Sequence, residues 1–486
     1  MSGARAVVSF VDLIFHHALL APAKPAIILP DRVVTYDMMA QGILCAEDRI
    51  RSLGLNPGVL VCVSIDSPIR TLIVSAALFR LGHPVIITGK PDDCLVLRLP
   101  VGAYLHDSGT PLIPGQRQAV VDESWFIGDR RKVLASPPRG FSDDGKICCV
   151  ALSSGTTGRP KPISLTIRAF QQWVENDFIL LGFRAWERLL LLVGLTTNWG
   201  FTLAAHALFA GRTLVFANNA RESLHMITLY NVEAAVATTL QLRDIVREQM
   251  REALPCPSLR MIATGGGLFS PSLIAEAQST LCNVIVTLYG SSEAGGTAIA
   301  SADKVGSIAG VAGFVAPWAE VEIVDDAGNE LPIGSEGIIR IRATCQGAPY
   351  PPGVDNPNFR GGWFYPDDLG RFTPDGLLVV TGRKSEVVNV GGLKLAPDVI
   401  EDVLRNHPAI SDAAAIGSVG EGGIEEVSIA IIAKTPVSDS HLIDWCGERG
   451  IPVARIFTVD VLPKTTSGKI QRDLLKRQLL EPDGSA

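Results

Sequence analysis

The chain has 486 residues, of which 47% are hydrophobic and 19% charged, so it holds enough apolar material for more than one domain core and is not a disordered chain. Lys and Arg number 43 against 50 Asp and Glu, and the net charge of −7 argues against a general nucleic-acid binder, because such proteins carry a basic excess. The nine cysteines lack the spacing of a zinc site or a disulfide scaffold. No stretch reaches the ~18–20 uninterrupted apolar residues of a membrane span. We therefore expect a cytoplasmic protein with reduced thiols.

The first two thirds of the chain predict alternating strands and helices. Ser9 and Asp12 resemble a capping box, which predicts an amphipathic helix in a fully retained chain rather than a signal peptide. A buried strand is expected over Val59–Ile65, a helix over Ile69–Leu81 and a further strand over Pro84–Thr88. This alternation is typical of parallel sheets in a layered α/β fold. The pattern returns at Leu189–Leu195, Thr202–Phe209, Thr213–Phe216 and Ala234–Thr238.

The sequence pattern changes from about residue 305, where Gly, Pro and Asp separate short strands of alternating polarity, as at Glu320–Val324, Ile338–Arg342 and Leu377–Thr381. These strands predict a compact antiparallel barrel or sheet. The last hundred residues predict a separate small α+β domain with a helix over Pro397–Asn406 and a final basic helix. The expected fold class is α/β: a large N-terminal domain of layered sheets with a small barrel-like β subdomain over 1–384, then a small mobile domain over 385–486.

A loop rich in hydroxyls and glycines follows the predicted strand Ile147–Leu152. Glycines allow close approach of the backbone and cations offset negative charge, so the loop suits a polyphosphate at the carboxyl end of a strand; an ordinary surface turn is the alternative. It is not a Walker loop, because the Gly-Lys-Ser/Thr ending is missing. The loop consists of Ser153, Ser154, Gly155, Thr156, Thr157, Gly158, Arg159, Pro160 and Lys161.

Two further motifs combine aromatic, hydroxyl and carboxylate groups. In the first, Tyr289 suits stacking on a purine, Ser292 suits phosphate oxygens and Glu293 suits Mg²⁺; a strand end followed by a Glu-bearing turn is the alternative. In the second, Asp367 and Asp368 are paired carboxylates that suit ribose hydroxyls, a metal or neighbouring turn amides.

Two more motifs lie near the C-terminus. Thr381–Glu386, followed by Asn389–Lys394, is a polar, glycine-bearing joint. Leu462–Arg472 presents Lys469 on a Ser-Gly turn just before a helix. A solvated face is the simplest interpretation of the cations in this region, and phosphates or an acidic carrier protein are the alternatives. These cations are Lys464, Lys469, Arg472, Lys476 and Arg477.

In this order and spacing, the five motifs resemble the adenylate-forming superfamily of acyl-CoA synthetases, peptide-synthetase adenylation domains and luciferase. The likeness covers essentially the whole chain and includes Ala23–Ile27, Val34–Tyr36 and Ala76–Gly82. The resemblance implies that a carboxylate attacks the α-phosphate of MgATP to give an acyl-adenylate and pyrophosphate. The thiol of CoA, or of the phosphopantetheine of a carrier protein, then displaces AMP to form a thioester. It also implies a C-terminal domain that alternates between two orientations.

The resemblance also implies which residues are catalytic. Ser292 would contact the α-phosphate and Glu293 would coordinate Mg²⁺. Lys469 would contact the substrate carboxylate and the α-phosphate during adenylation. In the thioester-forming orientation, the loop Asn389–Lys394 would replace Lys469.

The implied cofactor-binding residues surround the nucleotide. The loop Ser153–Lys161 would hold the β- and γ-phosphates of ATP, while Asp368 would bind the ribose hydroxyls with help from Arg383. Ser385 falls at the hinge position. Tyr289 would stack on adenine, and Gly290 belongs to the same cofactor-binding set. A wall shared by the adenine and acyl sites would come from Gly265, Gly266 and Gly267.

Three positions depart from the superfamily pattern: Pro162, Asp367 and Ser385. The second departure leaves open that Asp367 shares or takes the ribose-binding role. None of the three removes a catalytic group, so we expect an active enzyme. A phosphotransferase, a luciferase-like oxygenase and a catalytically silent partner protein are the alternatives.

The acyl pocket would be formed by Thr197, Asn198 and Trp199 together with Gly266. Amino-acid activators usually carry an aspartate for the substrate ammonium where this chain has Asn198, and burying an ammonium without a carboxylate is costly. We therefore expect a short or aromatic acid without an α-amino group; a stand-alone amino-acid activator is the alternative. Asn198 would donate to a ring hydroxyl, and Trp199 either floors the pocket or packs in the core. Neither the acceptor nor the oligomeric state follows from the sequence.

Overall fold

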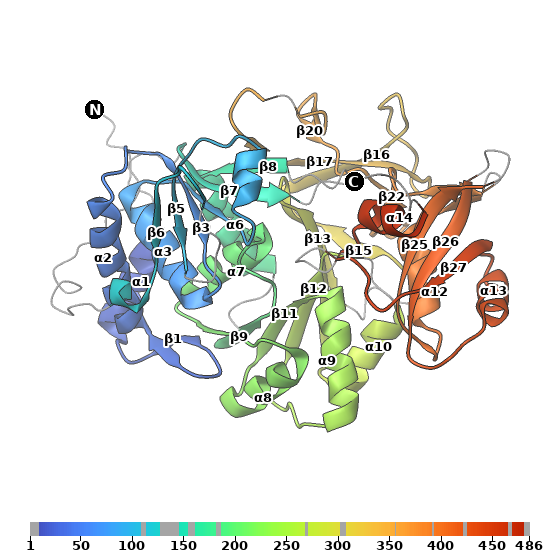
Figure 1. Ribbon diagram of the computed structural model, residues 1–486, viewed down its shortest axis with the longest axis horizontal. Helices are drawn as coiled ribbons and strands as arrows, with labels where there is room; N and C mark the ends of the chain where they lie inside the picture. The colour runs from blue at the N-terminus through green and yellow to red at the C-terminus, as the bar shows by residue number, and fades with distance from the viewer. Residues whose placement is uncertain are drawn as a thin grey trace.

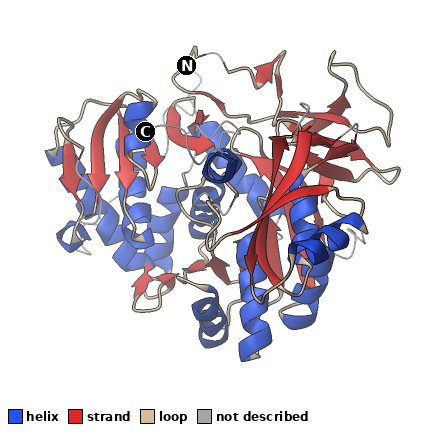
Figure 2. Ribbon diagram, turned by 45° about the vertical axis from the view of Figure 1, so that its right-hand side comes forward, coloured by secondary structure: helices blue, strands red, loops and turns tan. Residues whose placement is uncertain are grey.

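The computed structural model describes residues 9–107, 113–126, 145–153, 161–180, 186–267, 271–301, 308–354, 356–390, 393–420, 425–464 and 469–480. Two sheets covered by helices are followed by a smaller body at the red end of the chain (Figure 1). Figure 2 shows helices packed against the faces of the sheets rather than segregated from them. The expected fold class, a large α/β part followed by a small α+β part, is confirmed.

The first sheet runs in the order β18-β8-β7-β4-β3-β5-β6. Its centre confirms the predicted strand–helix–strand unit, because β3 (Leu60–Ser64) pairs parallel with β4 (Val85–Ile87) and α3 (Pro68–Leu81) connects them. The Ser67 hydroxyl caps the start of α3, and Gly82 ends it with a φ of 74° that favours glycine. The other elements here are α4 (Asp92–Val96), β5 (Val101–His106), β6 (Gln118–Val120), η1 (Glu123–Phe126), β7 (Ile147–Ser153), β8 (Lys161–Thr166) and β18 (Ala348–Pro349).

A buried ion cluster joins the N-terminal helices α1 (Phe10–Leu20), α2 (Tyr36–Ser52) and α3. The predicted capping box is confirmed, since Ser9 Oγ accepts from Asp12 N at 3.2 Å and Asp12 Oδ2 accepts from Ser9 N at 3.3 Å. Arg80 contacts Glu47, and Arg80 Nη1 lies 3.9 Å from Asp12 Oδ1, with all three side chains at most 4% exposed. The cluster therefore fixes three helices against one another inside the apolar core.

The second sheet runs in the order β19-β20-β17-β21-β22-β15-β14-β13-β12-β11-β9-β10-β1-β2, with β16 paired to β17. Strands β9, β11, β12 and β13 are parallel neighbours, so their carboxyl ends meet at one edge. The antiparallel strands beyond β14 confirm the antiparallel sheet predicted after about residue 305. They pack around a core of their own that includes Ile339, Ile341 and Phe364. They are joined to the parallel half because β14 pairs with both β13 and β15.

The elements of the parallel half are β1 (Pro25–Ile28), β2 (Val33–Thr35), α6 (Ile167–Leu180), β9 (Arg188–Leu191), α7 (Asn198–Phe209), β10 (Thr213–Val215), α8 (Ala220–Tyr230), β11 (Ala234–Thr238), α9 (Thr239–Glu252), β12 (Met261–Gly265), α10 (Pro271–Thr280) and β13 (Val284–Ser291). Those of the antiparallel half are β14 (Gly295–Ser301), β15 (Val311–Val315), β16 (Ala319–Val324), β17 (Gly337–Ala343), β19 (Phe359–Arg360), β20 (Trp363–Phe364), β21 (Asp368–Phe372) and β22 (Leu378–Arg383).

The C-terminal body is a three-stranded sheet covered by helices. Helix α12 packs on β25 through Ile400 and Leu404, and α14 packs on the sheet through Leu475. In the described part of the chain, no helix is long and apolar enough to cross a bilayer. The elements are β23 (Val388–Val390), β24 (Leu393–Leu395), α12 (Pro397–Arg405), β25 (Ile410–Val419), β26 (Glu425–Ala433), α13 (Asp439–Gly447), β27 (Val453–Thr458) and α14 (Arg472–Leu480).

Candidate active site

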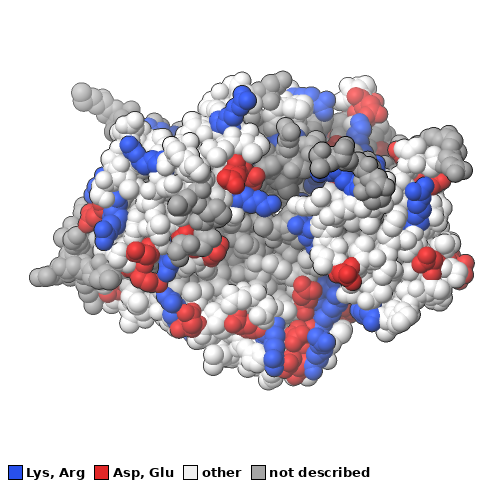
Figure 3. All heavy atoms as spheres, viewed as in Figure 1, with Lys and Arg blue, Asp and Glu red and all other residues white. Residues whose placement is uncertain are grey.

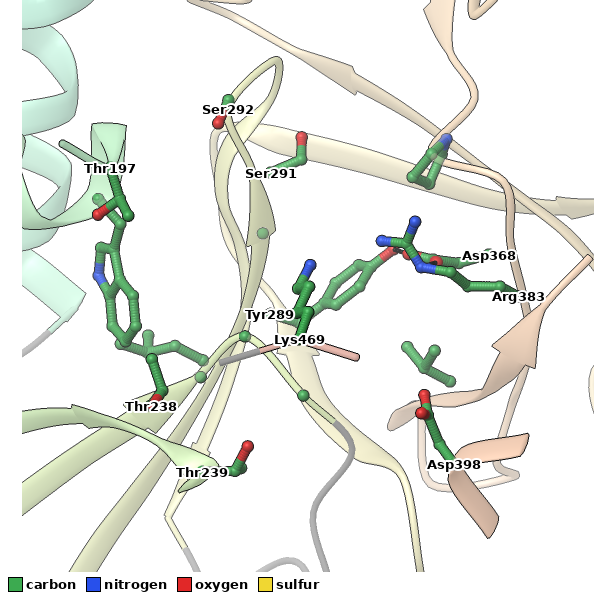
Figure 4. Close-up of a pocket in the computed structure, with 18 of the residues that line it drawn as sticks. Thr197, Thr238, Thr239, Tyr289, Ser291, Ser292, Asp368, Arg383, Asp398 and Lys469 are labelled. Atoms are coloured by element: carbon green, nitrogen blue, oxygen red, sulfur yellow. Dashed lines mark hydrogen bonds and ion pairs between the residues drawn. The ribbon is translucent and has the colours of Figure 1, made fainter. Parts of the chain in front are cut away.

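A cavity of about 1230 Å³ lies where the carboxyl ends of the parallel strands face the C-terminal body. Figure 4 shows Thr197 and Thr238 on one side of this cavity, Asp368 and Arg383 on the other, and Tyr289 and Lys469 between them. Residues 154–160 of the predicted phosphate loop lie outside the described residues. The strands on either side of the loop, β7 and β8, pair antiparallel, with Ser153 at the end of β7 opposite Lys161 at the start of β8. The predicted site residues in the cavity wall are Lys161, Thr197, Asn198, Trp199, Gly265, Gly266, Gly267, Tyr289, Gly290, Ser292, Glu293, Asp368, Arg383, Ser385 and Lys469.

Tyr289, Asp368 and Arg383 form one contact cluster. Asp368 and Arg383 are cross-strand partners on β21 and β22, which brings Arg383 Nε to 3.5 Å from Asp368 Oδ1. Tyr289, near the end of β13, donates its hydroxyl hydrogen to Asp368 Oδ2 at 2.7 Å. Burial raises the pKa of the Asp368 carboxylate and of the Tyr289 hydroxyl, and the guanidinium of Arg383 opposes both shifts. A ring and a carboxylate from distant parts of the chain are thus held together in the cavity wall.

The two neighbouring carboxylates of the paired motif have different partners. Asp367 has a φ of 70°, and its Oδ2 accepts from the backbone N of Ser385 at 3.3 Å and from the Ser385 hydroxyl. Asp368 instead faces the cavity and Tyr289. The alternative left open by the sequence, in which Asp367 takes the ribose-facing position, therefore finds no support in the geometry, because its carboxylate is bound at the joint.

The turn after β13 carries Ser292, labelled in Figure 4, and Glu293, and both residues line the cavity. Ser291 Oγ accepts from Ala294 N at 3.0 Å, which holds the turn in place. A Cβ on Gly290 would lie 2.3 Å from the carbonyl oxygen of Gly295, so this close approach requires glycine. Glu293 is 6% exposed.

The residues fit a magnesium ion that is shared with a phosphate ligand. Among the residues that the structure describes, no group of three or more His, Cys, Asp or Glu side chains would hold a metal by itself. Mg²⁺ usually takes only one or two protein carboxylates and completes its shell with substrate phosphates and waters. Glu293, which lines the cavity from a tightly held turn, meets that requirement.

Lys469 enters the cavity from the C-terminal body. Lys464 and Ile470 form an antiparallel bridge, and Gln471 N donates to Pro463 O at 2.8 Å, so the segments 463–464 and 470–471 are paired. Lys469 directly precedes the second segment, which leads into α14, and we call these two paired segments together with Lys469 the hairpin. Burial and the nearby Arg383 lower the pKa of the Lys469 ammonium, while Asp368 opposes them. A cation from the last hundred residues therefore lies with the Tyr289–Asp368–Arg383 cluster (Figure 4).

The side of the cavity expected to receive the acyl group, called the acyl side below, is built at the start of α7. Thr197 is the N-cap: its Oγ1 accepts from Gly200 N at 3.0 Å and donates to Gly194 O at 2.7 Å, so the hydroxyl is committed to the helix. Asn198 is buried, and its Oδ1 has no hydrogen-bond partner among the described residues. A buried acceptor without a partner costs free energy, and Asn198 also lines the cavity.

The glycine wall beside the acyl side is required by its neighbours. A Cβ on Gly265 would lie 2.8 Å from Leu288 O and 3.2 Å from the Trp199 ring, which packs against this strand end. A Cβ on Gly267 would lie 2.6 Å from the Thr239 hydroxyl oxygen. These glycines therefore let the two neighbouring strand ends and Trp199 approach one another closely.

Two tryptophans and an asparagine are among the cavity residues that sequence reasoning missed. Trp173 of α6 donates from Nε1 to Cys345 O at 2.8 Å, and Trp318 donates to Gly296 O at 2.9 Å. Asn358 accepts from Lys161 Nζ at 2.7 Å. The two tryptophans belong to none of the five motifs, so no sequence signal pointed to them. Asn358 lies beside Lys161 only in the folded sheet.

One expectation about the C-terminal cations was wrong for two of them. Lys464 pairs with Asp412, and Arg472 Nη2 lies 2.7 Å from Asp398 Oδ1 and 2.8 Å from Glu401 Oε1. These side chains are only 23% and 15% exposed, so they do not form a solvated face. Figure 3 shows Lys and Arg intermixed with Asp and Glu on the viewed face, in keeping with the mildly acidic net charge of −7.

Comparison with known proteins agrees with this geometry. The family model of AMP-binding enzymes matches residues 107–350, and that of the AMP-binding enzyme C-terminal domain matches residues 399–469. The 2-succinylbenzoate–CoA ligase of Bacillus licheniformis is 26% identical and covers 94% of this chain and 98% of its own. The fatty acid–acyl-carrier-protein ligase ScoC of Streptomyces coeruleorubidus is 24% identical and covers 95% and 94%.

A similar fold occurs in the o-succinylbenzoate CoA synthetase MenE of Bacillus subtilis, solved in complex with its acyl-adenylate intermediate. The TM-score is 0.81 at 22% identity, over 96% of this chain and 98% of that chain. The five motifs, the two matched domains and the shared fold agree, and the chain belongs to the family of AMP-binding enzymes.

Proposed function

We propose that this protein activates a carboxylic acid with MgATP, releases pyrophosphate and transfers the acyl group from the acyl-adenylate to a thiol. The observation that carries the proposal is the convergence of Lys469 on the cavity that also holds Tyr289 and Asp368. A cation, an aromatic ring and a buried carboxylate together match a ligand with phosphate, base and ribose groups. This convergence is what adenylation requires and what an unrelated surface turn would not produce.

In the first step, a carboxylate oxygen of the acid bonds to the α-phosphorus of ATP while the bond from that phosphorus to the leaving pyrophosphate breaks. Negative charge builds on the phosphoryl oxygens, and preorganised cations stabilise it most in a partly dehydrated cavity. Lys469 would supply this stabilisation at the α-phosphate and the acid, and Lys161 at the β- and γ-phosphates. Glu293 would hold Mg²⁺, which neutralises phosphate charge when it is bound.

The nucleotide would be positioned by the opposite wall of the cavity. Tyr289 would stack on adenine, and Asp368 would accept from the ribose hydroxyls while Arg383 holds its carboxylate in place. Gly265, Gly266 and Gly267 would form the wall shared with the acyl group. In the second step the thiol sulfur bonds to the acyl carbon, and AMP leaves with the former carboxylate oxygen.

For the substrate, we propose a short or aromatic acid without an α-ammonium group. The unpartnered Oδ1 of the buried Asn198 supports an acid that carries a neutral hydrogen-bond donor, because this amide supplies no charge to offset an ammonium. Relatives named for 2-succinylbenzoate and indoleacetate are consistent with an aromatic acid. Relatives named as CoA ligases and as a carrier-protein ligase leave either thiol as the acceptor.

The small domain would turn about Ser385 between the two steps, with the boundary of the two domains at that residue. In support, Ser385 lies between β22 and β23, and its hydroxyl is bound by Asp367. The position of Lys469 in the cavity wall supports an orientation suited to the first step.

The experiment is a pyrophosphate-release screen across short, aromatic, fatty and α-amino acids, with MgATP and then with CoA or a phosphopantetheinylated carrier protein added in turn. AMP and pyrophosphate formed with an aryl or short acid would support the proposal. An ordinary α-amino acid as the best substrate would overturn the assignment of the Asn198 pocket. ADP as the product would indicate a phosphotransferase instead.

A further inference from the structure

Both ends of the hairpin that carries Lys469 are fixed by ion pairs of the C-terminal body. At the first end, Lys464 pairs with Asp412 of β25. At the second end, Arg472 begins α14 and contacts Asp398 and Glu401 of α12. Arg472 Nη1 also lies 3.2 Å from Glu386, directly after the joint at Ser385.

Glu401 joins the two ends. Its Oε1 lies 2.8 Å from Arg472 Nη2 and accepts from Ala415 N at 3.0 Å, while its Oε2 lies 3.0 Å from Arg405 Nη2. Arg405 Nε in turn lies 2.9 Å from Asp412 Oδ1, which completes a continuous series of contacts from Lys464 to Arg472. We refer to this series as the hairpin clamp: Lys464, Asp412, Arg405, Glu401 and Arg472.

Glu401 is buried, with its side chain only 2% exposed. Burial raises the pKa of this carboxylate, and the charges of Arg472 and Arg405 oppose the rise. Removing a carboxylate from water is costly unless its charge is paired and its oxygens are hydrogen-bonded, as they are here. What such an arrangement provides in return is a fixed geometry, because Arg472 and Arg405 each bridge Glu401 to a second carboxylate, and such charge-assisted contacts are short and directional.

Fixed geometry matters at this hairpin because the Lys469 ammonium must contact the α-phosphate and the acid in a cavity whose opposite wall is built by other sheets. A misplacement of about 1 Å costs a catalytic contact up to a hundredfold in rate. We propose that Glu401 is a positioning residue for Lys469, which it holds in the cavity through the hairpin clamp. The proposal rests on the adenylation role of Lys469 proposed above.

The test substitutes Glu401→Gln, which keeps the size of the side chain, removes its charge and replaces one of its two acceptor oxygens with a donor NH₂ group. We expect the single-turnover rate of acyl-adenylate formation to fall by about tenfold to a hundredfold. The KM for ATP and the conversion of a supplied acyl-adenylate to thioester should stay near the unsubstituted values, because neither uses the position of Lys469.

A double-variant cycle separates positioning from a general structural effect. If Glu401 acts through Lys469, Glu401→Gln adds no further loss of adenylation in the Lys469→Ala background. A loss of the same fold-change in both backgrounds would overturn the proposal. Glu47→Gln is the matched control, because Glu47 is also 2% exposed and lies between two arginines, Arg80 and Arg51, outside the cavity wall. It should leave both half-reactions unchanged at a temperature where the variant is folded.

Hydrogen exchange provides a readout that does not depend on activity. Glu401→Gln should speed amide exchange over residues 469–472 by about tenfold while exchange at β3 stays unchanged. If Glu401→Gln exchanges faster but the unsubstituted protein releases no pyrophosphate with any acid, the hairpin clamp stands and only the proposed function is overturned. Unchanged exchange would overturn the clamp. If Glu401→Gln does not fold, Arg472→Lys, which keeps the charge but not the fork, is measured in the same way with the same outcomes.

Discussion

Asp367 and Asp368 are neighbours in the sequence with separate partners in the structure, which makes them a matched pair for testing the nucleotide site. In Asp368→Asn, the carboxylate that accepts from the Tyr289 hydroxyl at 2.7 Å and faces Arg383 at 3.5 Å becomes a neutral amide of the same size. We expect the KM for ATP to rise sharply, because the ribose hydroxyls and Tyr289 lose a charged acceptor.

The magnitude follows from the contacts. A hydrogen bond to a charged group contributes about 1.5–3 kcal/mol. Because about 1.4 kcal/mol corresponds to a factor of ten, the loss of one such bond to the ribose predicts a KM about tenfold to a hundredfold higher. Asp367→Asn changes an exposed contact to Ser385, and exposed substitutions usually alter free energies by less than about 0.5 kcal/mol, or roughly twofold.

The assay is initial-rate pyrophosphate release at varied ATP and saturating acid, with urea unfolding of each variant as the control for folding. The expected result is a large effect of Asp368→Asn on KM and a small effect of Asp367→Asn. Equal increases in both variants, or a larger increase in Asp367→Asn, would show that the carboxylate bound at the joint also serves the ribose, and would refute the separation of roles.

Three further predictions concern the catalytic cation and the stability of the two domains. Lys469→Ala should lose acyl-adenylate formation by about a hundredfold or more, as expected for a preorganised charge stabiliser, yet still convert a supplied acyl-adenylate to thioester; equal losses in both steps would contradict this role. Arg80→Met should lower the free energy of unfolding by about 3–5 kcal/mol, because Glu47 and Asp12 stay buried without their shared cation. Urea unfolding measures this change, and a loss below about 1 kcal/mol, which is typical of a surface ion pair, would refute the prediction. Burial opposes ionisation of Asp412, but Arg405 and Lys464 hold the pKa of its carboxylate below the ordinary 3.8. The ionised carboxylate therefore stabilises the fold above pH 3.8, and this contribution is lost as the pH falls through the lower pKa of the folded state. In Asp412→Asn, this part of the acid dependence of the free energy of unfolding should disappear.

Local patterns in the sequence predicted the elements that local chemistry determines. The capping box at Ser9, the strand over Val59–Ile65 and the helix that ends at Gly82 all depend on residues a few positions apart, and all three are in the structure. The motif order also identified Lys469, Glu293 and Asp368 as cavity residues, although they come from different parts of the fold.

Partners far apart in the chain could not be predicted in this way. The cations Lys464 and Arg472 look solvated in a linear sequence, because Asp412 and Glu401 lie more than 50 positions away and carry no motif. Trp173 reaches the cavity only because α6 packs beside β14, and Asn358 meets Lys161 only through the folded sheet. Sequence reasoning could not assign Asp367 either, since its direction depends on a left-handed backbone conformation at that residue.

The most direct test of the account follows one oxygen atom. The acid found in the pyrophosphate-release screen is labelled with ¹⁸O in its carboxylate and incubated with the protein, MgATP and the thiol acceptor, and the products are analysed by mass spectrometry. The account predicts that AMP gains a single ¹⁸O atom, because the carboxylate oxygen bonds to the α-phosphorus and leaves with AMP when the thiol attacks the acyl carbon. Unlabelled AMP, or label in inorganic phosphate together with ADP, would contradict adenylate formation in this cavity.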